Sequence, residues 1–132
     1  MIAKAYAVGA RVEHNQLLID KGQYGGAKGL PPADYKLSHR LNNGNGCFTF
    51  CMCPGGYVMP SMSEKNTIVT NGMSEYKRDS GFANSAVLVG ITPDDYGKGV
   101  FDGIVLQESL EKKAFEFGKN YSAGGKPFAP PY

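Results

Sequence analysis

Residues 42–56 read NNGNGCFTFCMCPGG, and this stretch decides much of the expected fold. Asn and Gly tolerate positive φ, so the NNGNG run predicts a tight turn. The turn would join a strand over 34–41 to a strand over 47–53, which makes residues 34–53 a β-hairpin. The PGG that follows interrupts the second strand.

The chain before this hairpin predicts a strand, a short helix and a loop. A first strand is expected over 4–14, where apolar side chains from Tyr6 onward alternate onto one face. Asn15 is a suitable N-cap for a short helix, which the glycines from Gly22 onward would end. Residues 27–33 are rich in Gly and Pro and predict a loop.

The chain after the hairpin predicts two more strands and one longer helix. Residues 67–70 predict a short strand, closed by the turn dipeptide Asn-Gly at 71–72. Residues 86–92 form a near-continuous apolar run, typical of a strand buried on both faces. A helix is expected after Asp102, with one apolar stripe and Gly118 at its end.

This order of elements does not alternate strand and helix regularly, so it predicts an α+β fold. We expect a mostly antiparallel sheet that could curl into a barrel. A short N-terminal helix and one longer C-terminal helix would pack against it. The length of 132 residues suits one domain, expected over 1–120, with the Gly- and Pro-rich residues 121–132 as a linker.

The charge balance excludes several classes of partner. The net charge is +2 and like charges do not cluster, so neither nucleic acid nor an anionic membrane surface is expected as a partner. The apolar runs are far shorter than the ~20 residues of a membrane span. The three cysteines fall within 47–53 and do not form a secreted disulfide framework, which favours the reducing cytoplasm.

The cysteines are the most unusual candidates for chemistry. Side chains on a strand repeat every two residues, so Cys47, Cys51 and Cys53 are expected on one face. They could pack as small hydrophobes, or they could serve redox chemistry. Three thiols are too few for a structural zinc site, and His14 and His39 show no ligand spacing to them, so no metal is expected.

Two further groups of residues have both a purely structural and a functional interpretation. Gly55 and Gly56 could form an ordinary turn, or they could let the backbone closely approach a ligand. Arg11 and His14 end the first strand, where they could lie on a solvated face or contact a ligand. No complete nucleotide phosphate loop is found, since the possible motif that opens at Gly44 lacks its last glycine.

As a whole, the chain resembles one segment of a family of uncharacterised FAD-dependent dehydrogenases. Three stretches carry the resemblance: AVGARVEH at 7–14, FCMCPGG at 50–56 and VTNGMS at 69–74. DYKL at 34–37 and ANSA at 83–86 reinforce it. The resemblance implies a cap or substrate-side domain inserted between two parts of a Rossmann-type FAD-binding domain, whose phosphate-binding glycines lie outside this chain.

The resemblance also implies cofactors and partners. FAD is expected in the full-length parent and not in this chain, and NADH or NADPH could be a co-substrate. The expected partners are the absent FAD-binding domain and an unknown small-molecule substrate, so the chain alone should be an inactive fragment of an oxidoreductase. The candidate site residues are Cys51 and Cys53 (redox or flavin-proximal), Gly55 and Gly56 (cofactor-binding in the full-length protein), and Arg11 and His14 (substrate side).

An inserted domain should bring its ends together, so the first strand and the Pro-rich tail are expected on one side. The alternative function is a non-catalytic binding or interaction module, in which the glycines are only turns and the cysteines only packing. The reactivity of the Cys51 and Cys53 thiols would discriminate between these two functions.

Overall fold

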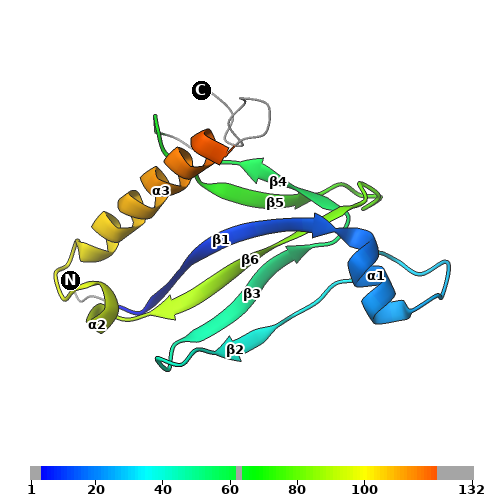
Figure 1. The fold of residues 1–132 in the computed structure, drawn as a ribbon, viewed down its shortest axis with the longest axis horizontal. Coiled ribbons are helices and arrows are strands. Elements are labelled where there is room, and N and C mark those ends of the chain that lie inside the picture. The colour runs from blue at the N-terminus through cyan, green and yellow to red at the C-terminus, as the bar shows by residue number, and fades with distance from the viewer. Residues whose placement is uncertain (1–3, 62–63, 122–132) are drawn as a thin grey trace. The chain divides into compact units, whose positions relative to one another are not determined.

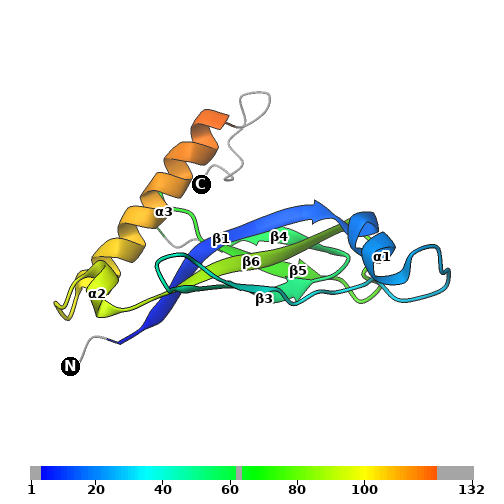
Figure 2. The same cartoon turned by 60° about the horizontal axis from the view of Figure 1, so that its bottom comes forward.

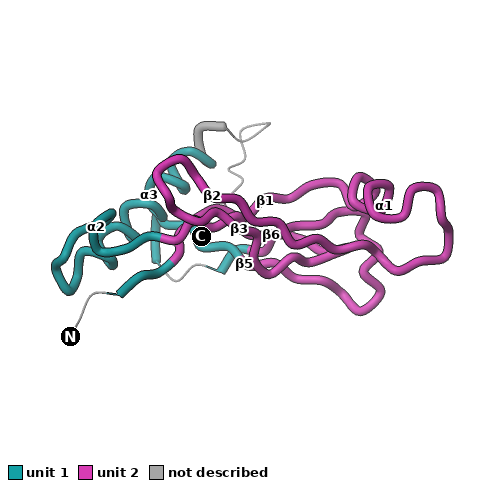
Figure 3. The backbone as a smooth tube through the Cα atoms, turned by 90° about the horizontal axis from the view of Figure 1, so that it is seen from below, with its two compact units in different colours: residues 1–6, 60–70, 91–132 teal, residues 7–59, 71–90 magenta. Residues whose placement is uncertain are grey.

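The computed structural model describes residues 4–61 and 64–121, and the chain divides into two compact units (Figure 3). Unit 1 combines Met1–Tyr6, Pro60–Thr70 and Ile91–Tyr132, and unit 2 combines Ala7–Met59 and Asn71–Gly90. Within the described residues, none of the helices has the length and apolar character needed to cross a membrane.

Most of the β structure belongs to unit 2. A four-stranded sheet has the order β1 (Tyr6–Asn15), β6 (Phe82–Ile91), β3 (Gly46–Cys53) and β2 (Ser38–Arg40). A separate two-stranded sheet joins β4 (Gly56–Pro60) to β5 (Thr70–Ser74). β3 pairs antiparallel with both β2 and β6, and β1 and β6 run in opposite directions (Figure 1).

The α+β class and the antiparallel pairing are confirmed, but the expected barrel is wrong. The sheet stays open, with β1 and β2 as its two edges. The physical reason is the short β2, which offers only three residues for pairing and cannot close the sheet.

The hairpin around the NNGNG turn is confirmed, with a shorter first strand than expected. The Leu41 amide donates to the Asn45 carbonyl over 2.9 Å, and Gly44 adopts φ +87°. Residues 34–37 do not form part of β2. There the Leu37 amide donates to the Thr49 hydroxyl oxygen over 2.8 Å. In a regular ladder this amide would donate to a backbone carbonyl instead.

A β-bulge interrupts β3 near its end. Phe50 pairs with Ala86, whereas Cys53 pairs with Asn84, so three steps on β3 face two steps on β6. Cys51 lies inside the bulge with φ +49°, in the left-handed region.

The bulge corrects the expectation that all three cysteines share one face. Cys47 pairs with Val89 before the bulge, and Cys53 pairs with Asn84 after it. Positions 84 and 89 of β6 are an odd number of residues apart, so their side chains point to opposite faces. Cys53 therefore lies on the face opposite Cys47.

Two expectations for the later strands are also wrong. The Asn-Gly pair at 71–72 lies within β5 and does not form a turn. β6 begins at Phe82, and Ala83, Asn84 and Ser85 are its most buried stretch, whereas Val87 is 37% exposed. The apolar run at 86–92 is thus not buried on both faces, because one face at Val87 borders an open pocket.

The helices differ from the expected pair. α1 (Gln16–Tyr24) follows β1 directly (Figure 2), and the Asn15 side chain caps it by accepting from the Leu17 amide over 2.7 Å. An additional short helix, α2 (Pro93–Tyr96), was not expected. It begins with Pro93 and with a capping box, in which the Thr92 amide donates to the Asp95 carboxylate over 2.8 Å.

α3 (Asp102–Tyr121) continues past Gly118, the expected end of the long helix. Its expected core-facing stripe is largely exposed, since Val105 and Phe117 are 62% and 64% exposed. The predicted linker and the predicted proximity of the chain ends depend on residues 122–132, which lie outside the described residues.

Candidate functional site

Arg11 connects three strands of unit 2. Its guanidinium Nη1 donates to the Asn84 side-chain oxygen over 2.5 Å and to the Cys51 carbonyl over 3.1 Å. The Cys53 sulfur lies 4.0 Å from the same nitrogen. A Cβ on Gly72 of β5 would collide with Arg11, Asn84 and Cys53, so β5 lies directly against this cluster. Arg11 is therefore committed to internal hydrogen bonds.

The environment of the two candidate redox cysteines is unequal. All three cysteines are free thiols, and Cys51 is exposed. Burial raises the pKa of the Cys53 thiol, and the neighbouring Cys51 adds to this while Arg11 opposes it. Cys53 is thus mainly a protonated thiol near neutral pH, the less reactive form. A redox role for this pair stays a prediction.

The Pro-Gly-Gly segment is buried against the protein's own chain. The Gly55 amide donates to the Gln16 side-chain oxygen over 2.8 Å. Gly55 has φ +58°, and a Cβ there would collide with the backbone of Arg78. A Cβ on Gly56 would collide with the backbone of Met73. These internal contacts explain why both positions are glycine, and their cofactor role stays a prediction.

Gln16 holds this segment in place. It is 4% exposed, and its amide nitrogen donates to the Asp20 carboxylate over 2.8 Å and to the Ala33 carbonyl over 2.9 Å. One side chain at the start of α1 thus binds both the long loop before β2 and the Gly55 amide. No pattern in the sequence singles out Gln16, since its partners are distant along the chain.

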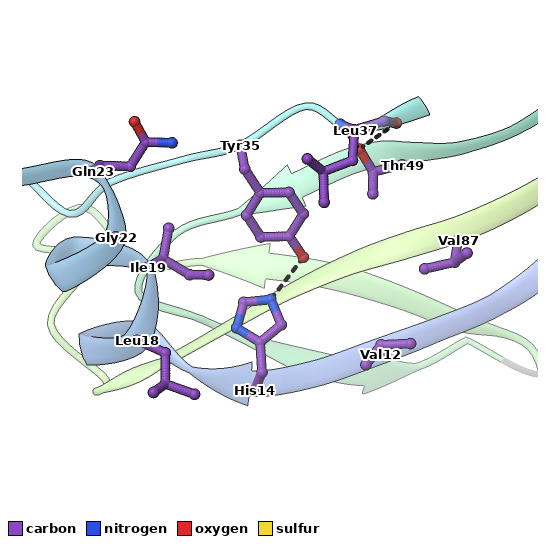
Figure 4. Close-up of a pocket in the computed structure, with 10 residues that line it drawn as sticks. All are labelled: Val12, His14, Leu18, Ile19, Gly22, Gln23, Tyr35, Leu37, Thr49 and Val87. Carbon is purple, nitrogen blue, oxygen red and sulfur yellow. Dashed lines mark hydrogen bonds between the residues drawn. The ribbon is translucent and has the colours of Figure 1, made fainter. Parts of the chain in front are cut away.

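A pocket of about 500 Å³ lies on the other face of the sheet (Figure 4). Val12 of β1, Val87 of β6 and Ile19 of α1 contribute apolar walls. The pocket contains a polar pair, because His14 Nε2 and the Tyr35 hydroxyl lie 2.7 Å apart. Mostly apolar pockets of this size with few polar groups are typical small-molecule sites, and this one is open to solvent at Leu18 and Leu37.

The polar pair is only partly satisfied by the protein. His14 Nδ1 is buried, and no hydrogen-bond partner for it is found among the described residues. Burial raises the pKa of Tyr35, while a hydrogen bond with Ser85 and the charge of Arg11 act in the opposite direction. Tyr35 therefore remains a neutral phenol, which can donate a hydrogen bond.

Four of the predicted site residues thus separate into two places. Arg11, Cys51 and Cys53 meet on one face of the sheet, and His14 lies on the other. Sequence reasoning missed Tyr35, the partner of His14. In the part of the chain that the structure describes, no three His, Cys, Asp or Glu side chains gather in a way that could hold a metal ion.

Comparison with known proteins identifies the family. Residues 5–128 match the family described as "FAD-dependent protein, C-terminal domain-like". The chain belongs to this family. An uncharacterized protein from Clostridium beijerinckii is 43% identical over 129 residues, which cover 93% of this chain and 24% of the relative. The chain therefore spans about a quarter of that relative's length.

The Gly55 turn and the starts of α1 and α3 do not fit the pyrophosphate of FAD. Its pyrophosphate needs free backbone N–H groups, commonly at a helix N-terminus after a glycine turn. The Gly55 amide is bound by Gln16, and the first amides of α1 are bound by Gly81 and Asn15. α3 starts with the Asp102 carboxylate, which accepts from the Gly99 amide over 2.8 Å. A phosphate would meet negative charge there.

Proposed function

We propose that this domain forms the substrate-side wall of the flavin cleft in an FAD-dependent oxidoreductase of the dehydrogenase type. The FAD would be held by the remaining polypeptide, and this chain would supply enclosure and polar contacts. The observation that carries the proposal is the pocket on the open sheet face, with the His14–Tyr35 pair inside a mostly apolar wall. Membership in a family of FAD-dependent proteins supports it.

The rim of the pocket also supports a covering partner. Leu18 and Leu37 line the pocket, yet they are 67% and 62% exposed. Exposed apolar patches commonly mark interaction surfaces or ligand grooves. The relative from C. beijerinckii is about four times as long as the matched segment. A polypeptide of that length has enough additional residues to cover this rim. We assign that role to its FAD-binding part.

Hydrogen–deuterium exchange of the full-length parent tests whether the pocket faces the flavin. We expect peptides covering residues 12–23 and 35–37 to exchange more slowly in the flavin-loaded protein than in the flavin-stripped protein. Reloading the stripped protein with FAD should restore the protection. Anaerobic addition of NADH or NADPH to the loaded protein should bleach the flavin absorbance, as expected for a dehydrogenase.

Equal exchange rates in both segments with and without bound FAD would contradict the substrate-side wall. This result would favour the interaction module. A flavin that neither nucleotide reduces would contradict the dehydrogenase assignment alone.

A further inference from the structure

The hydrogen-bond geometry determines what Tyr35 offers to a ligand. A neutral imidazole carries one proton, and a buried N–H without an acceptor is rarer than an unused acceptor. Because His14 Nδ1 is buried and lacks a partner in the described structure, the proton belongs on Nε2. His14 Nε2 then donates to the Tyr35 oxygen, 2.7 Å away. The tyrosine O–H is left to donate either to the neighbouring Ser85 or to a ligand.

The charge of the pocket wall restricts the ligand further. The residues that line the pocket in the described part of the chain include no Lys, Arg, Asp or Glu. Burying a carboxylate or an ammonium group against such a wall would be costly without a charged partner. A neutral acceptor avoids this cost and can take the tyrosine proton in place of Ser85.

We propose that the pocket binds a neutral, largely apolar carbonyl compound, whose oxygen accepts a hydrogen bond from the Tyr35 hydroxyl. The walls formed by Val12, Ile19 and Val87 bury the apolar part of the ligand. His14 is a positioning residue that directs the tyrosine proton toward the ligand. This inference names the substrate class and rests on the proposed function.

Binding to the 132-residue chain, without flavin, tests the ligand class separately from the flavin cleft. The probes are acetophenone, ethylbenzene and benzoate, which all contain a benzene ring. Acetophenone has a neutral carbonyl, ethylbenzene has no hydrogen-bond acceptor, and benzoate has a negative charge. Amide NMR titrations would follow Val12 and Val87, after spectral dispersion shows that the chain is folded. We expect acetophenone to bind about three- to tenfold more tightly than ethylbenzene, and benzoate to bind more weakly than acetophenone.

Matched variants assign the effect to the pocket. Tyr35→Phe should remove the preference for acetophenone, whereas Tyr57→Phe, which changes a tyrosine outside the pocket, should keep it. Gly22 lines the pocket and has open space around its Cβ position, so Gly22→Leu should weaken both neutral probes. Gly26 has equal space outside the pocket, and Gly26→Leu should leave binding unchanged.

Equal binding of acetophenone and ethylbenzene, preferred binding of benzoate, or no shift at the pocket amides would each overturn the inference. A preference that survives in Tyr35→Phe would do the same. None of these results depends on whether the parent's flavin lies against this face, which the exchange experiment measures independently.

Discussion

Cys51 and Cys53 are two residues apart and have different surroundings. The bulge exposes Cys51, whereas Cys53 is partly covered and lies near Arg11 and Gly72. The raised pKa of Cys53 means that its thiolate appears only at higher pH than that of an ordinary thiol. The partial cover over Cys53 and its raised pKa therefore both slow reaction at Cys53.

We expect iodoacetamide at neutral pH to alkylate Cys51 roughly tenfold faster than Cys53 in the folded chain. Two variants, each with Cys47→Ser and one further Cys→Ser change, would report the two thiols separately by mass spectrometry. In denaturant the two rates should become equal, which serves as the control. A Cys53 that reacts as fast as Cys51 in the folded chain would contradict the protonated thiol and support the redox role.

α1 connects the end of β1 to the pocket, because Leu18, Ile19 and Gly22 all line it. The helix is short, and isolated helices of this length are marginal in water, so its first turn depends on its cap. The Asn15 side chain satisfies one amide of that turn.

Asn15→Ala should lower the free energy of unfolding by about 1 kcal/mol, since the Leu17 amide loses its acceptor. Urea unfolding followed by circular dichroism would measure this change. Asn15→Ser keeps a capping oxygen and should retain most of the stability. An unfolding midpoint in Asn15→Ala equal to that of the unchanged chain would show that the cap contributes little.

Short-range signals explain which elements were predictable from sequence. The cap at Asn15 and the turn around Gly44 depend on residues within a few positions, and the structure has both. The capping box at Thr92 was equally local, so α2 could have been found. The open sheet depends on long-range pairing instead, and no local pattern fixes it.

The candidate site was less predictable for the same reason. The bulge in β3 places Cys47 and Cys53 on opposite faces of the sheet, and strand alternation alone cannot reveal a bulge. Tyr35 meets His14 across 21 positions, from a segment that was expected to be a regular strand. The residues of the pocket come from β1, α1, the loop before β2, β3 and β6, which only the fold brings together.

At the scale of the whole chain, the apolar residues are poorly covered. The buried hydrophobic residues of the described part are Ala33, Ala83 and Ile91, all but Ile91 small. Many larger ones are exposed, among them Phe50 at 60%. Free-standing domains of this length bury a larger apolar core, and these surfaces are the ones that the proposed FAD-binding part would cover.

The isolated chain should therefore bind the hydrophobic dye anilinonaphthalene sulfonate more strongly than an equimolar, flavin-stripped full-length parent. Dye fluorescence would measure this, and a cooperative urea transition would show that the chain is folded and not a molten globule. If the parent binds as much dye as the chain, these surfaces stay open in the longer protein and need another partner.

The bulge at Cys51 determines where along β3 the deletion of one residue can be absorbed. Deleting one residue between Phe50 and Cys53 would remove the bulge and leave Cys53 opposite Asn84 in a regular ladder. The same deletion in the NNGNG turn could be absorbed by the loop without reversing β3. One-residue deletions in homologous chains should consequently be tolerated near residues 44 and 51 and eliminated between Cys47 and Phe50, where they would reverse the faces of β3.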